Sequence, residues 1–313
     1  MIKSPLVGVV LVNFNGHNDT MECLKSLKKL TYLAVKIYVV DNGSKETPEA
    51  LFRKAKGLFD EQNLELMSLK DNLGFAGGNN IGIRKAISDG AQYIWLLNND
   101  TVVDEESLGH LVLMLENNER CGIVGSKIYF YGTNKIWFAG GTINRFGIPH
   151  HRRYCEVDYQ SSLDEEKVPI DYITGCSLLA RSEMINEIGL LDEDFFLYYE
   201  DTEYCRRAVR LGWGLEYQPK SLIWHKVNAS TKSKLRDPIP LLDYYDIRNS
   251  ILFVRRSYHT TQKILPFIGI VIKIIKKHIR LMIRPETRKI NKIKMIYHAI
   301  YDAIHSRYGV YRT

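Results

Sequence analysis

Short apolar segments that end abruptly in polar side chains are the feature that most restricts the fold of this chain. The clearest is Ile-Trp-Leu-Leu at residues 94–97, which is followed at once by Asn98, Asn99 and Asp100. A segment that is apolar on both faces is typical of a central strand in a sheet covered on both sides. Ligands of open α/β sheets bind beyond the carboxyl ends of such strands, so these polar residues are predicted to line a cleft. An ordinary Asn-Asp turn has the same local sequence and is the alternative.

Strand-like and helix-like segments alternate through the first hundred residues. Strands are predicted at residues 6–14, 35–40, 64–69 and 93–97. One helix is predicted from a cap at Asp19 to about Leu30, a second from Pro48 onward, and a third that ends at about Ser88. A fourth is predicted from Asp104 onward, because the three consecutive acids that begin there are favourable in a first turn. Connections of this length make right-handed βαβ units, so the pattern predicts a doubly wound parallel α/β sheet with helices on both faces.

Polar residues follow three of these strands: Asn13 and Asn15 after the first, Asp41 after the second, and residues 98–100 after the fourth. Strand ends that meet at one edge of a sheet make a nucleotide crevice the default prediction. The glycine-rich residues 74–78 have neither the spacing of a dinucleotide fingerprint nor a Walker A Gly-Lys-Ser/Thr. They are predicted either to let the backbone approach a ligand or to form a flexible surface loop.

The pattern is less regular beyond a strand predicted at residues 121–128. The adjacent His150 and His151 could suggest a metal site, but neighbouring residues of a strand point to opposite faces. They are therefore predicted to belong to a solvated basic stretch. A further strand is expected within residues 170–180, and Ser182 is expected to cap a short helix.

Two adjacent acids, Glu200 and Asp201, follow an aromatic run and stand at a predicted helix start. The unpaired amides of a helix N-terminus stabilise carboxylates, so capping alone would explain Asp201. Two later strands are predicted at residues 213–217 and 221–225, and His225 ends the second. A lone histidine in such a position is more often structural than a ligand, and both interpretations stay open.

Size and composition indicate one large globular core, or a core with an appendage. The chain has 313 residues, of which 45% are hydrophobic and 25% charged. Its five cysteines are scattered without a C-x-x-C pair, which argues against a zinc site or a disulfide framework and is typical of a reducing cytosol. We expect no signal peptide and no bilayer-spanning segment.

Charge is distributed unequally along the chain. Residues 232–313 contain 18 Lys and Arg against 5 Asp and Glu, whereas residues 1–231 contain 25 against 31. On a helix, one stripe would hold Lys273, Lys276, Lys277, Arg280 and Arg284, and the opposite side would hold Ile264, Ile268, Val271, Ile275, Ile279 and Met282. A basic face beside a broad apolar face is typical of a helix lying on an anionic membrane. The alternative is that the apolar face packs on the rest of the protein.

Seven short motifs occur in order between residues 5 and 230. They are VNFNG (12–16), VVDNGS (39–44), NLGFAGGNN (72–80), LLNNDT (96–101), TGCSLLARSEM (174–184), YEDTEYCRR (199–207) and WH (224–225). Each is weak alone, but together they resemble the inverting glycosyltransferases of family 2, most closely bacterial rhamnosyltransferases and galactofuranosyltransferases. The resemblance implies a GT-A fold, a Rossmann-like mixed sheet with helices on both faces, in residues 1–231. A basic, amphipathic helical extension would follow in residues 232–313.

The resemblance also implies which residues bind a nucleotide-sugar donor, within about residues 1–104. They are Asn13, Asn15, Asp41, Gly77, Asn79, Asn98, Asn99 and Asp100, with Asp41 on the pyrimidine. Asp100 and His225 would hold a Mg²⁺ or Mn²⁺ ion that bridges the donor phosphates. The family's metal motif is usually D-x-D, and its first position is Asn98 here, so fewer charges are expected to hold the ion.

Residues 105–231 would carry the acceptor and catalytic part. Asp201 corresponds to the base that takes the proton from the acceptor hydroxyl, and Glu200, Thr174 and Gly175 to acceptor-binding residues. The implied reaction moves a sugar from dTDP-rhamnose or a UDP-sugar, with inversion, to a saccharide acceptor on a lipid carrier in cell-surface polysaccharide synthesis. The enzyme would be cytoplasmic and peripheral to the inner leaflet of the cell membrane, with a homodimer as an open alternative.

Two other functions remain as alternatives. A sugar nucleotidyltransferase has a similar fold but carries a G-x-G-T-R loop after its first strand, where this chain has Asn-Phe-Asn-Gly. A non-enzymatic protein that binds nucleic acid or membranes is suggested only by the basic tail. We expect no nucleic acid as a partner.

Overall fold

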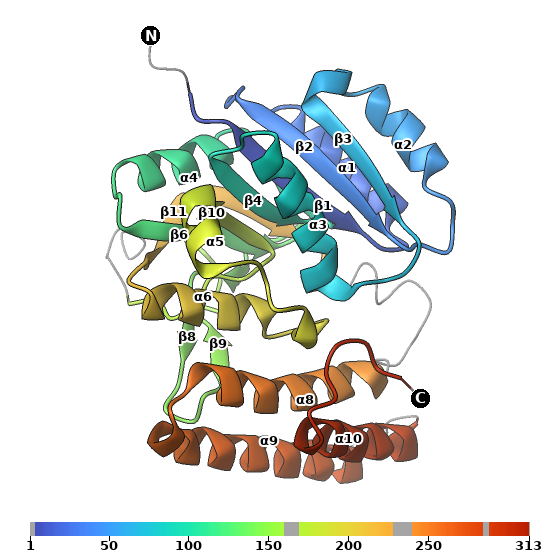
Figure 1. Ribbon diagram of the computed structural model, residues 1–313, viewed down its shortest axis with the longest axis vertical. Coiled ribbons are helices and arrows are strands. Elements are labelled where there is room, and N and C mark those ends of the chain that lie inside the picture. The colour runs from blue at the N-terminus through green and yellow to red at the C-terminus, as the bar shows by residue number, and fades with distance from the viewer. Residues whose placement is uncertain (1–3, 160–168, 228–239, 284–287, 313) are drawn as a thin grey trace.

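The apolar segments of the first half lie side by side in the computed structural model, which describes residues 4–159, 169–227, 240–283 and 288–312 (Figure 1). They form β1 (Val7–Asn13), β2 (Val35–Asn42), β3 (Leu64–Leu69) and β4 (Tyr93–Asn98), paired in parallel in the order β3-β2-β1-β4. Val9, Val10 and Leu11 of β1 are fully buried, because helices cover both faces of the sheet. The four predicted strands are confirmed to within two residues.

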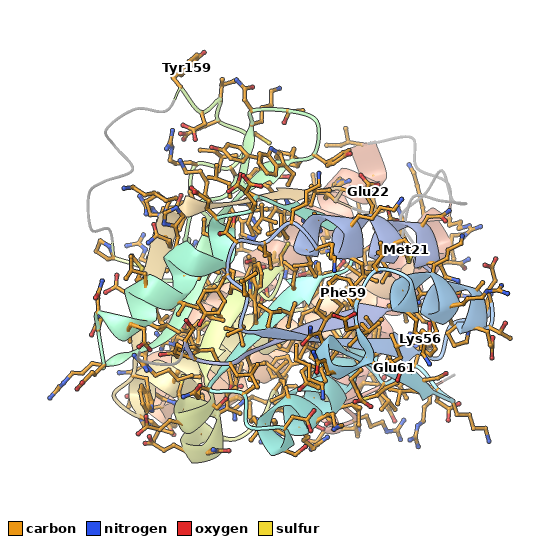
Figure 2. The ribbon with its side chains drawn as sticks, turned by 90° about the horizontal axis from the view of Figure 1, so that it is seen from above. Met21, Glu22, Lys56, Phe59, Glu61 and Tyr159 are labelled. Carbon is orange, nitrogen blue, oxygen red and sulfur yellow. The ribbon has the colours of Figure 1, made fainter. Side chains whose placement is uncertain are left out.

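The helices of this half lie on opposite faces of the sheet. Helices α1 (His17–Leu27) and α2 (Glu49–Lys56) connect β1 to β2 and β2 to β3, and α3 (Gly74–Ser88) returns to β4. Because the direction of strand addition reverses after β3, right-handed crossovers place α3 opposite α1 and α2. Seen from above, Met21 of α1 and Phe59 beyond α2 lie on one flank, where both pack on the core (Figure 2). The predicted cap Asp19 lies inside α1, whose N-cap is Gly16.

The glycine-rich stretch is the start of α3, so the expectation of a flexible surface loop is wrong. Gly78 and Gly82 face β1, and a Cβ on Gly82 would lie 2.4 Å from a methyl carbon of Val10. The missing side chains let the helix approach the central strand closely. Helix packing, which residue spacing alone does not reveal, explains these glycines.

The second half makes the sheet mixed. Strands β10 (Ser177–Arg181), β6 (Cys121–Phe130), β11 (Gly214–His225) and β5 (Thr101–Val103) follow β4 in that order. Strand β10 is antiparallel to both of its neighbours. Of the predicted segment 170–180, only the last four residues, Ser177–Ala180, belong to this strand.

Three details of the second half differ from the predicted segments. The two predicted late strands are one strand, β11, with an irregularity between Gln218 and Leu222, where Pro219 cannot donate a ladder hydrogen bond. Because the unpredicted β5 follows β4, the next helix, α4 (Ser107–Glu116), begins later than Asp104. Ser182 opens α5 (Ser182–Ile188) but makes no cap bond; its hydroxyl donates to the Ala91 carbonyl.

A short hairpin connects the sheet to the C-terminal helices. Strands β8 (Gly141–Ile143) and β9 (Pro149–His151) pair with each other and extend from the sheet toward α9 (Figure 1). A Cβ on Gly269 of α9 would lie 2.3 Å from the carbonyl oxygen of Phe146, so the tip of the hairpin packs closely against that helix.

The C-terminal helices form a layer beside α6 (Glu200–Arg210) (Figure 1). They are α8 (Pro240–Ser257), α9 (Ile264–Ile283) and α10 (Lys289–Ile304). A second hydrophobic core unites them with Phe195 and Tyr199, which precede α6. These helices therefore share a core with the segment that leads into the acidic pair. The predicted boundary between residues 231 and 232 lies outside the described residues.

The orientation of α9 contradicts the expectation that its apolar face covers the protein. Lys273 and Lys277 point inward and form ion pairs with Asp246 and Asp243 of α8. The predicted apolar residues are 44% to 75% exposed, and they are Ile264, Ile268, Val271, Ile275, Ile279 and Met282. Arg284, the last residue of the predicted stripe, lies outside the described residues. Among the described helices, none has both the length and the apolar character needed to cross a bilayer.

Candidate active site

Two adjoining cavities lie at the carboxyl edge of β1, β4 and β11, with volumes of about 790 and 420 Å³. The smaller is lined by the ends of β1 and β4 and by the start of α3. The larger is lined by the segment before β10, the start of α6 and the β8–β9 hairpin. Both are bordered by Phe75, Asn98, Leu197, Tyr198, Leu242 and His225. The fold therefore provides two compartments that open into each other.

Four predicted donor-binding residues, Asn79, Asn98, Asn99 and Asp100, line the smaller cavity. The other four, Asn13, Asn15, Asp41 and Gly77, lie nearby but outside the lining of both cavities. Gly77 is one of the α3 glycines. Asn15 is exposed, and its side-chain oxygen accepts a hydrogen bond from the backbone N–H of Lys45. The structure thus brings the residues after β4 into the cavity more directly than those after β1 and β2.

Asp41 is the centre of a buried hydrogen-bond network at the ends of β1 and β2. Its Oδ2 accepts from Asn13 Nδ2 at 2.6 Å and from the Ser44 hydroxyl at 2.8 Å, and its Oδ1 accepts from the Ser44 amide at 3.1 Å. The side-chain oxygen of Asn13 in turn accepts from the hydroxyl of Thr20 in α1. These bonds fix the two strand ends relative to α1.

The predicted metal ligands face each other where the cavities meet. Oδ1 of Asp100 lies 3.1 Å from Nε2 of His225, and both side chains are buried. The pairing of β5 with β11 produces this contact, because His225 is opposite Thr101, the residue after Asp100. Nδ1 of His225 is buried and has no hydrogen-bond partner among the described residues. Trp137 packs edge-on against the ring, with 4.6 Å between the ring centroids. Within the described residues, no three His, Cys, Asp or Glu side chains form a metal-binding group.

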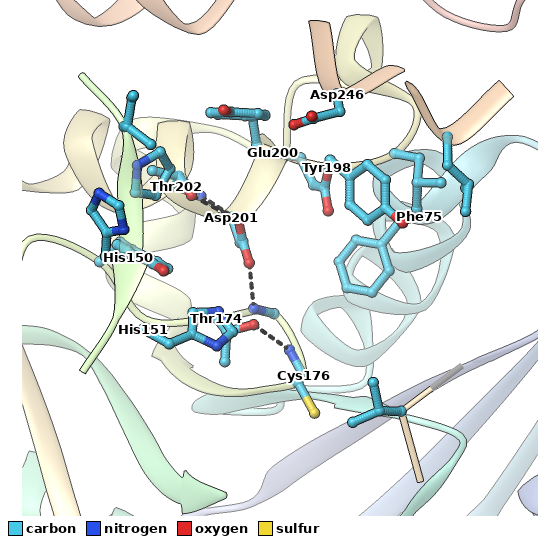
Figure 3. A pocket seen from close by; sticks show the side chains of 18 of the residues that line it. Phe75, His150, His151, Thr174, Cys176, Tyr198, Glu200, Asp201, Thr202 and Asp246 are labelled. Atoms are coloured by element: carbon cyan, nitrogen blue, oxygen red, sulfur yellow. Dashed lines mark hydrogen bonds between the residues drawn. The ribbon is translucent and has the colours of Figure 1, made fainter. Parts of the chain in front are cut away.

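Asp201 lies in the wall of the larger cavity, between Phe75 and Tyr198 on one side and His150 on the other (Figure 3). Its Oδ2 accepts from the Gly175 amide at 2.9 Å, and its Oδ1 accepts from the Thr202 amide at 2.6 Å. Thr174 and Gly175 line the same cavity. The structure therefore brings together all four residues predicted for acceptor binding and catalysis.

Glu200 differs sharply from its neighbour. The side chain is buried, and its Oε2 has no hydrogen-bond partner in the described structure. Burial, reinforced by the charge of Asp201, raises the pKa of Glu200 well above its usual range. Glu200 is therefore a hydrogen-bond donor in the cavity wall over a wider pH range than an exposed glutamate.

Several residues of the larger cavity were missed from the sequence. His150 is exposed as predicted, but His151 is only partly exposed, because it packs against Trp137 and Phe138, and burial lowers its pKa. Tyr172 adds a further aromatic wall. Asp246 and Lys273 reach the cavity from the C-terminal helices. A sequence pattern that could have revealed Asp246 and Lys273 is the helical spacing of two acids in α8 and two lysines in α9, which allows ion pairs between the two helices.

Residues 8–189 match the model of the family described as glycosyl transferase family 2. The chain belongs to this family. The matched part runs from β1 to the residue after α5, so it includes the ends of β1, β2 and β4. The predicted family is thereby confirmed, and the protein is a glycosyltransferase.

Relatives of this family 2 glycosyltransferase include bacterial rhamnosyltransferases. The dTDP-rhamnosyl transferase RfbF of Shigella flexneri is 24% identical over 301 residues, which cover 94% of each chain. The N-acetylglucosaminyl-diphospho-decaprenol L-rhamnosyltransferase of Mycobacterium tuberculosis is 25% identical over 248 residues, covering 74% of this chain and 78% of that protein.

Solved structures share the fold at low sequence identity. The mannosyltransferase PcManGT from Pyrobaculum calidifontis, in complex with GDP-Man and Mn²⁺, has a TM-score of 0.58 at 13% identity, with 97% of this chain and 76% of that chain covered. S. aureus TarS 1–349 in complex with UDP-GlcNAc has a TM-score of 0.59 at 13% identity, covering 96% and 81%. The family 2 enzyme therefore has the predicted GT-A fold, followed by C-terminal helices.

Proposed function

We propose that this glycosyltransferase moves a sugar from a nucleotide-sugar to a hydroxyl of a saccharide acceptor, with inversion at the anomeric carbon. The observation that carries the proposal is the junction of the two cavities. Asp100 faces the smaller cavity, Asp201 faces the larger one, and His225 borders both. A base on one side of the anomeric carbon and a leaving diphosphate on the other are the arrangement that a direct, inverting displacement needs.

Asp201 is proposed as the base that accepts the proton of the acceptor hydroxyl. Its bonds to the amides of Gly175 and Thr202 hold the carboxylate in one orientation in the cavity wall. The Thr202 hydroxyl donates a third bond, at 3.1 Å, to Oδ1. An ionised carboxylate has about four lone-pair sites, so these three bonds leave capacity for the acceptor hydroxyl. Glu200, whose pKa is raised by burial, is proposed to donate a hydrogen bond to the acceptor sugar.

Asp100 and His225 are proposed to hold Mg²⁺ or Mn²⁺ together with the donor. A carboxylate oxygen and an imidazole nitrogen 3.1 Å apart can share one ion, and the same Nε2 of His225 lies 3.5 Å from the side-chain nitrogen of Asn98 at the cavity border. Two protein ligands do not fill the coordination shell of such an ion, so phosphate oxygens of the donor and water would supply the remaining ligands. When bound, the ion supplies charge stabilisation for the leaving diphosphate. PcManGT is a structural neighbour with Mn²⁺ present.

The donor is proposed to be dTDP-rhamnose or a UDP-sugar. RfbF is a dTDP-rhamnosyl transferase by name, and the TarS structure contains UDP-GlcNAc. Asp41 is proposed to accept from the pyrimidine, since its Oδ1 carries one bond from Ser44 and can take another. An acid that reads a base N–H selects against bases without that donor.

Release of nucleoside diphosphate tests the proposal. The enzyme is incubated with a saccharide acceptor and, in turn, dTDP-rhamnose, UDP-sugars and a GDP-sugar, and the anomeric configuration of the product is determined by NMR. We expect release with one pyrimidine donor and an inverted product. Retention of configuration, or preference for the GDP-sugar, would overturn the mechanism or the donor assignment.

We further propose that the acceptor is carried on a lipid in cell-surface polysaccharide synthesis, and that the enzyme lies on the cytoplasmic leaflet. The mycobacterial relative acts, by its name, on a diphospho-decaprenol. The apolar residues of α9 point outward, and the exposed Lys276 of α9 and Lys294 of α10 lie on the same helical layer. No residue of α9 is acidic, so this surface complements an anionic leaflet, where each basic residue adds about 1 kcal/mol. Cosedimentation with neutral and anionic liposomes measures the association.

A further inference from the structure

The segment that leads into Glu200 and Asp201 has an unusual backbone. Phe196, Tyr198 and Tyr199 have φ angles of 60°, 71° and 72°, in the left-handed region that side chains other than glycine rarely adopt. Three such residues within four positions persist only where the surroundings hold them in place. Residues 194–199 are called the left-handed segment below.

Asn249 of α8 holds this segment through its carbonyl groups. Its Nδ2 donates to the carbonyl oxygens of Phe195 at 2.6 Å, Leu197 at 2.6 Å and Tyr198 at 3.1 Å. The amide is fully buried, and its Oδ1 accepts from Nε of Arg248 at 2.9 Å. That bond fixes which end of the amide faces the segment.

Arg248 binds the same segment beside Asn249. One terminal nitrogen donates to the carbonyl oxygens of Asp194 at 2.9 Å and Phe195 at 3.0 Å, and the other donates to Gly309 beyond α10. Its guanidinium lies over the rings of Tyr244 and Tyr245 and is fully buried. A buried cation is tolerated only when its donors are satisfied, and here backbone carbonyls satisfy them.

The left-handed segment also contacts the donor side. The Phe196 carbonyl accepts from the amide of Phe75 at 2.7 Å, and the Phe196 ring stacks on Tyr245 at 5.0 Å. Phe75 borders both cavities. The path of this segment therefore sets the direction of Asp201 and the position of a side chain at the cavity junction.

We propose that Arg248 and Asn249 are positioning residues for catalysis: they hold the left-handed segment in the path that points the Asp201 carboxylate into the larger cavity. The proposal assumes that Asp201 is the base. The C-terminal helices are then part of the catalytic apparatus, in addition to any role at a membrane. Neither residue lines the two described cavities.

The first test compares Asn249→Ala, Asn249→Asp and the control Ser250→Ala. Ser250 is also buried in α8, but its hydroxyl bonds to Ile247 of the same helix. Displacement of a base by about 1 Å lowers turnover about 100-fold. We expect both Asn249 variants to lose about 10- to 100-fold in kcat with the donor KM changed by less than about twofold, and the control to keep both constants.

Asn249→Asp separates hydrogen bonding from packing. The replacement has the same shape but puts a carboxylate oxygen where the three carbonyls need a donor. A wild-type kcat in Asn249→Asp would overturn the proposal, because packing alone would then be sufficient. If the Asn249 variants do not fold, Arg248→Lys replaces them. Lysine keeps the buried cation, but its single nitrogen cannot take the places of the two guanidinium nitrogens that bind Asp194 and Phe195 on one side and Gly309 on the other.

Amide hydrogen exchange of residues 195–202 gives a readout that does not depend on activity. We expect faster exchange there in Asn249→Ala or Arg248→Lys, and wild-type exchange in Ser250→Ala. Unchanged exchange in the first two would overturn the proposal. Faster exchange together with full activity of Asp201→Asn would instead show that the segment is held as proposed while Asp201 is not the base.

Discussion

The proposed donor side and the proposed acceptor side of the active-site edge are built in different ways. On the donor side, Asn13, Asp41 and Asn98 are the polar ends of neighbouring parallel strands, and the core residues that place them are next to them in the chain. On the acceptor side, Gly175 and Asp201 come from separate segments, and the C-terminal helices hold the backbone between them. A site made of strand ends can be found from the pattern of strands, whereas the residues of the other side were predicted only through the motifs that resemble the family.

The two sides also differ in how their buried polar groups are satisfied. The Asp41 carboxylate accepts three hydrogen bonds, from Asn13 and Ser44. Glu200 has an unpartnered oxygen, and three left-handed residues precede it, each destabilising by about 1–3 kcal/mol. Backbone strain of this kind is concentrated at functional sites in proteins, and here it lies on the proposed acceptor side.

The largest effect that tests this contrast is expected for Asp201→Asn. The amide keeps the shape but cannot accept a proton, so transfer should fall about 10²- to 10⁴-fold. Binding of the donor, measured by calorimetry, should change little, because Asp201 lines only the larger cavity. Near-normal turnover would reduce Asp201 to a residue that stabilises the start of α6.

Asp100→Ala should affect the donor side instead. Without its carboxylate the proposed ion is held by His225 alone, so activity should fall about 100-fold. Binding of UDP or dTDP should also lose its dependence on Mn²⁺. The matched control is Asp104→Ala, an acid four residues later and outside both cavities. Full activity of the wild-type enzyme in excess chelator would contradict the metal assignment.

Two carboxylates of the acceptor side should respond to pH in opposite ways. Burial and the charge of Asp201 raise the pKa of Glu200 in the folded protein. The carboxyl group therefore ionises more readily in the unfolded chain, and the free energy of unfolding falls as pH rises above about 4.3. Glu200→Gln should therefore unfold at a higher temperature than the wild type at pH 8, and this advantage should disappear near pH 4. An advantage that grew in acid would mean that Glu200 is stabilised in its ionised form.

Asp246→Asn provides the comparison for Glu200. Burial alone would raise the pKa of Asp246, but Lys273 and Lys277 outweigh it and lower that pKa. The ionised group stabilises the fold above about pH 3.9, and this contribution is lost as pH falls through the lowered pKa. The variant should be destabilised by about 1–3 kcal/mol at pH 7 and less in acid, as thermal unfolding can measure.

The smallest effect concerns the outer face of α9. Ile275 is 51% exposed, so a membrane could still bury about half of its apolar area, worth about 1 kcal/mol. Ile275→Glu should lower the fraction bound to anionic liposomes about fivefold. Leu113→Glu, at an exposed position of α4, should leave binding unchanged. Equal binding of both variants would leave this face without a membrane role.

The sequence by itself determined the parallel half of the sheet and the polar ends of its strands. Continuous apolar runs bounded by turns have few alternatives to buried strands, and residues at the ends of parallel strands must share an edge. It also indicated that Glu200 and Asp201 open a helix, because two acids are favourable in a first turn. Short motifs in one order were sufficient to predict the family.

Tertiary structure alone decided which side of α9 faces inward. The helical period shows that the helix has a basic and an apolar face, but each could be buried against a suitable neighbour. Asp243 and Asp246 of α8 select the lysine side through ion pairs, and the isoleucines are left on the surface. The left-handed segment before α6 was equally hidden, since its backbone path depends on Asn249, about fifty residues further along the chain.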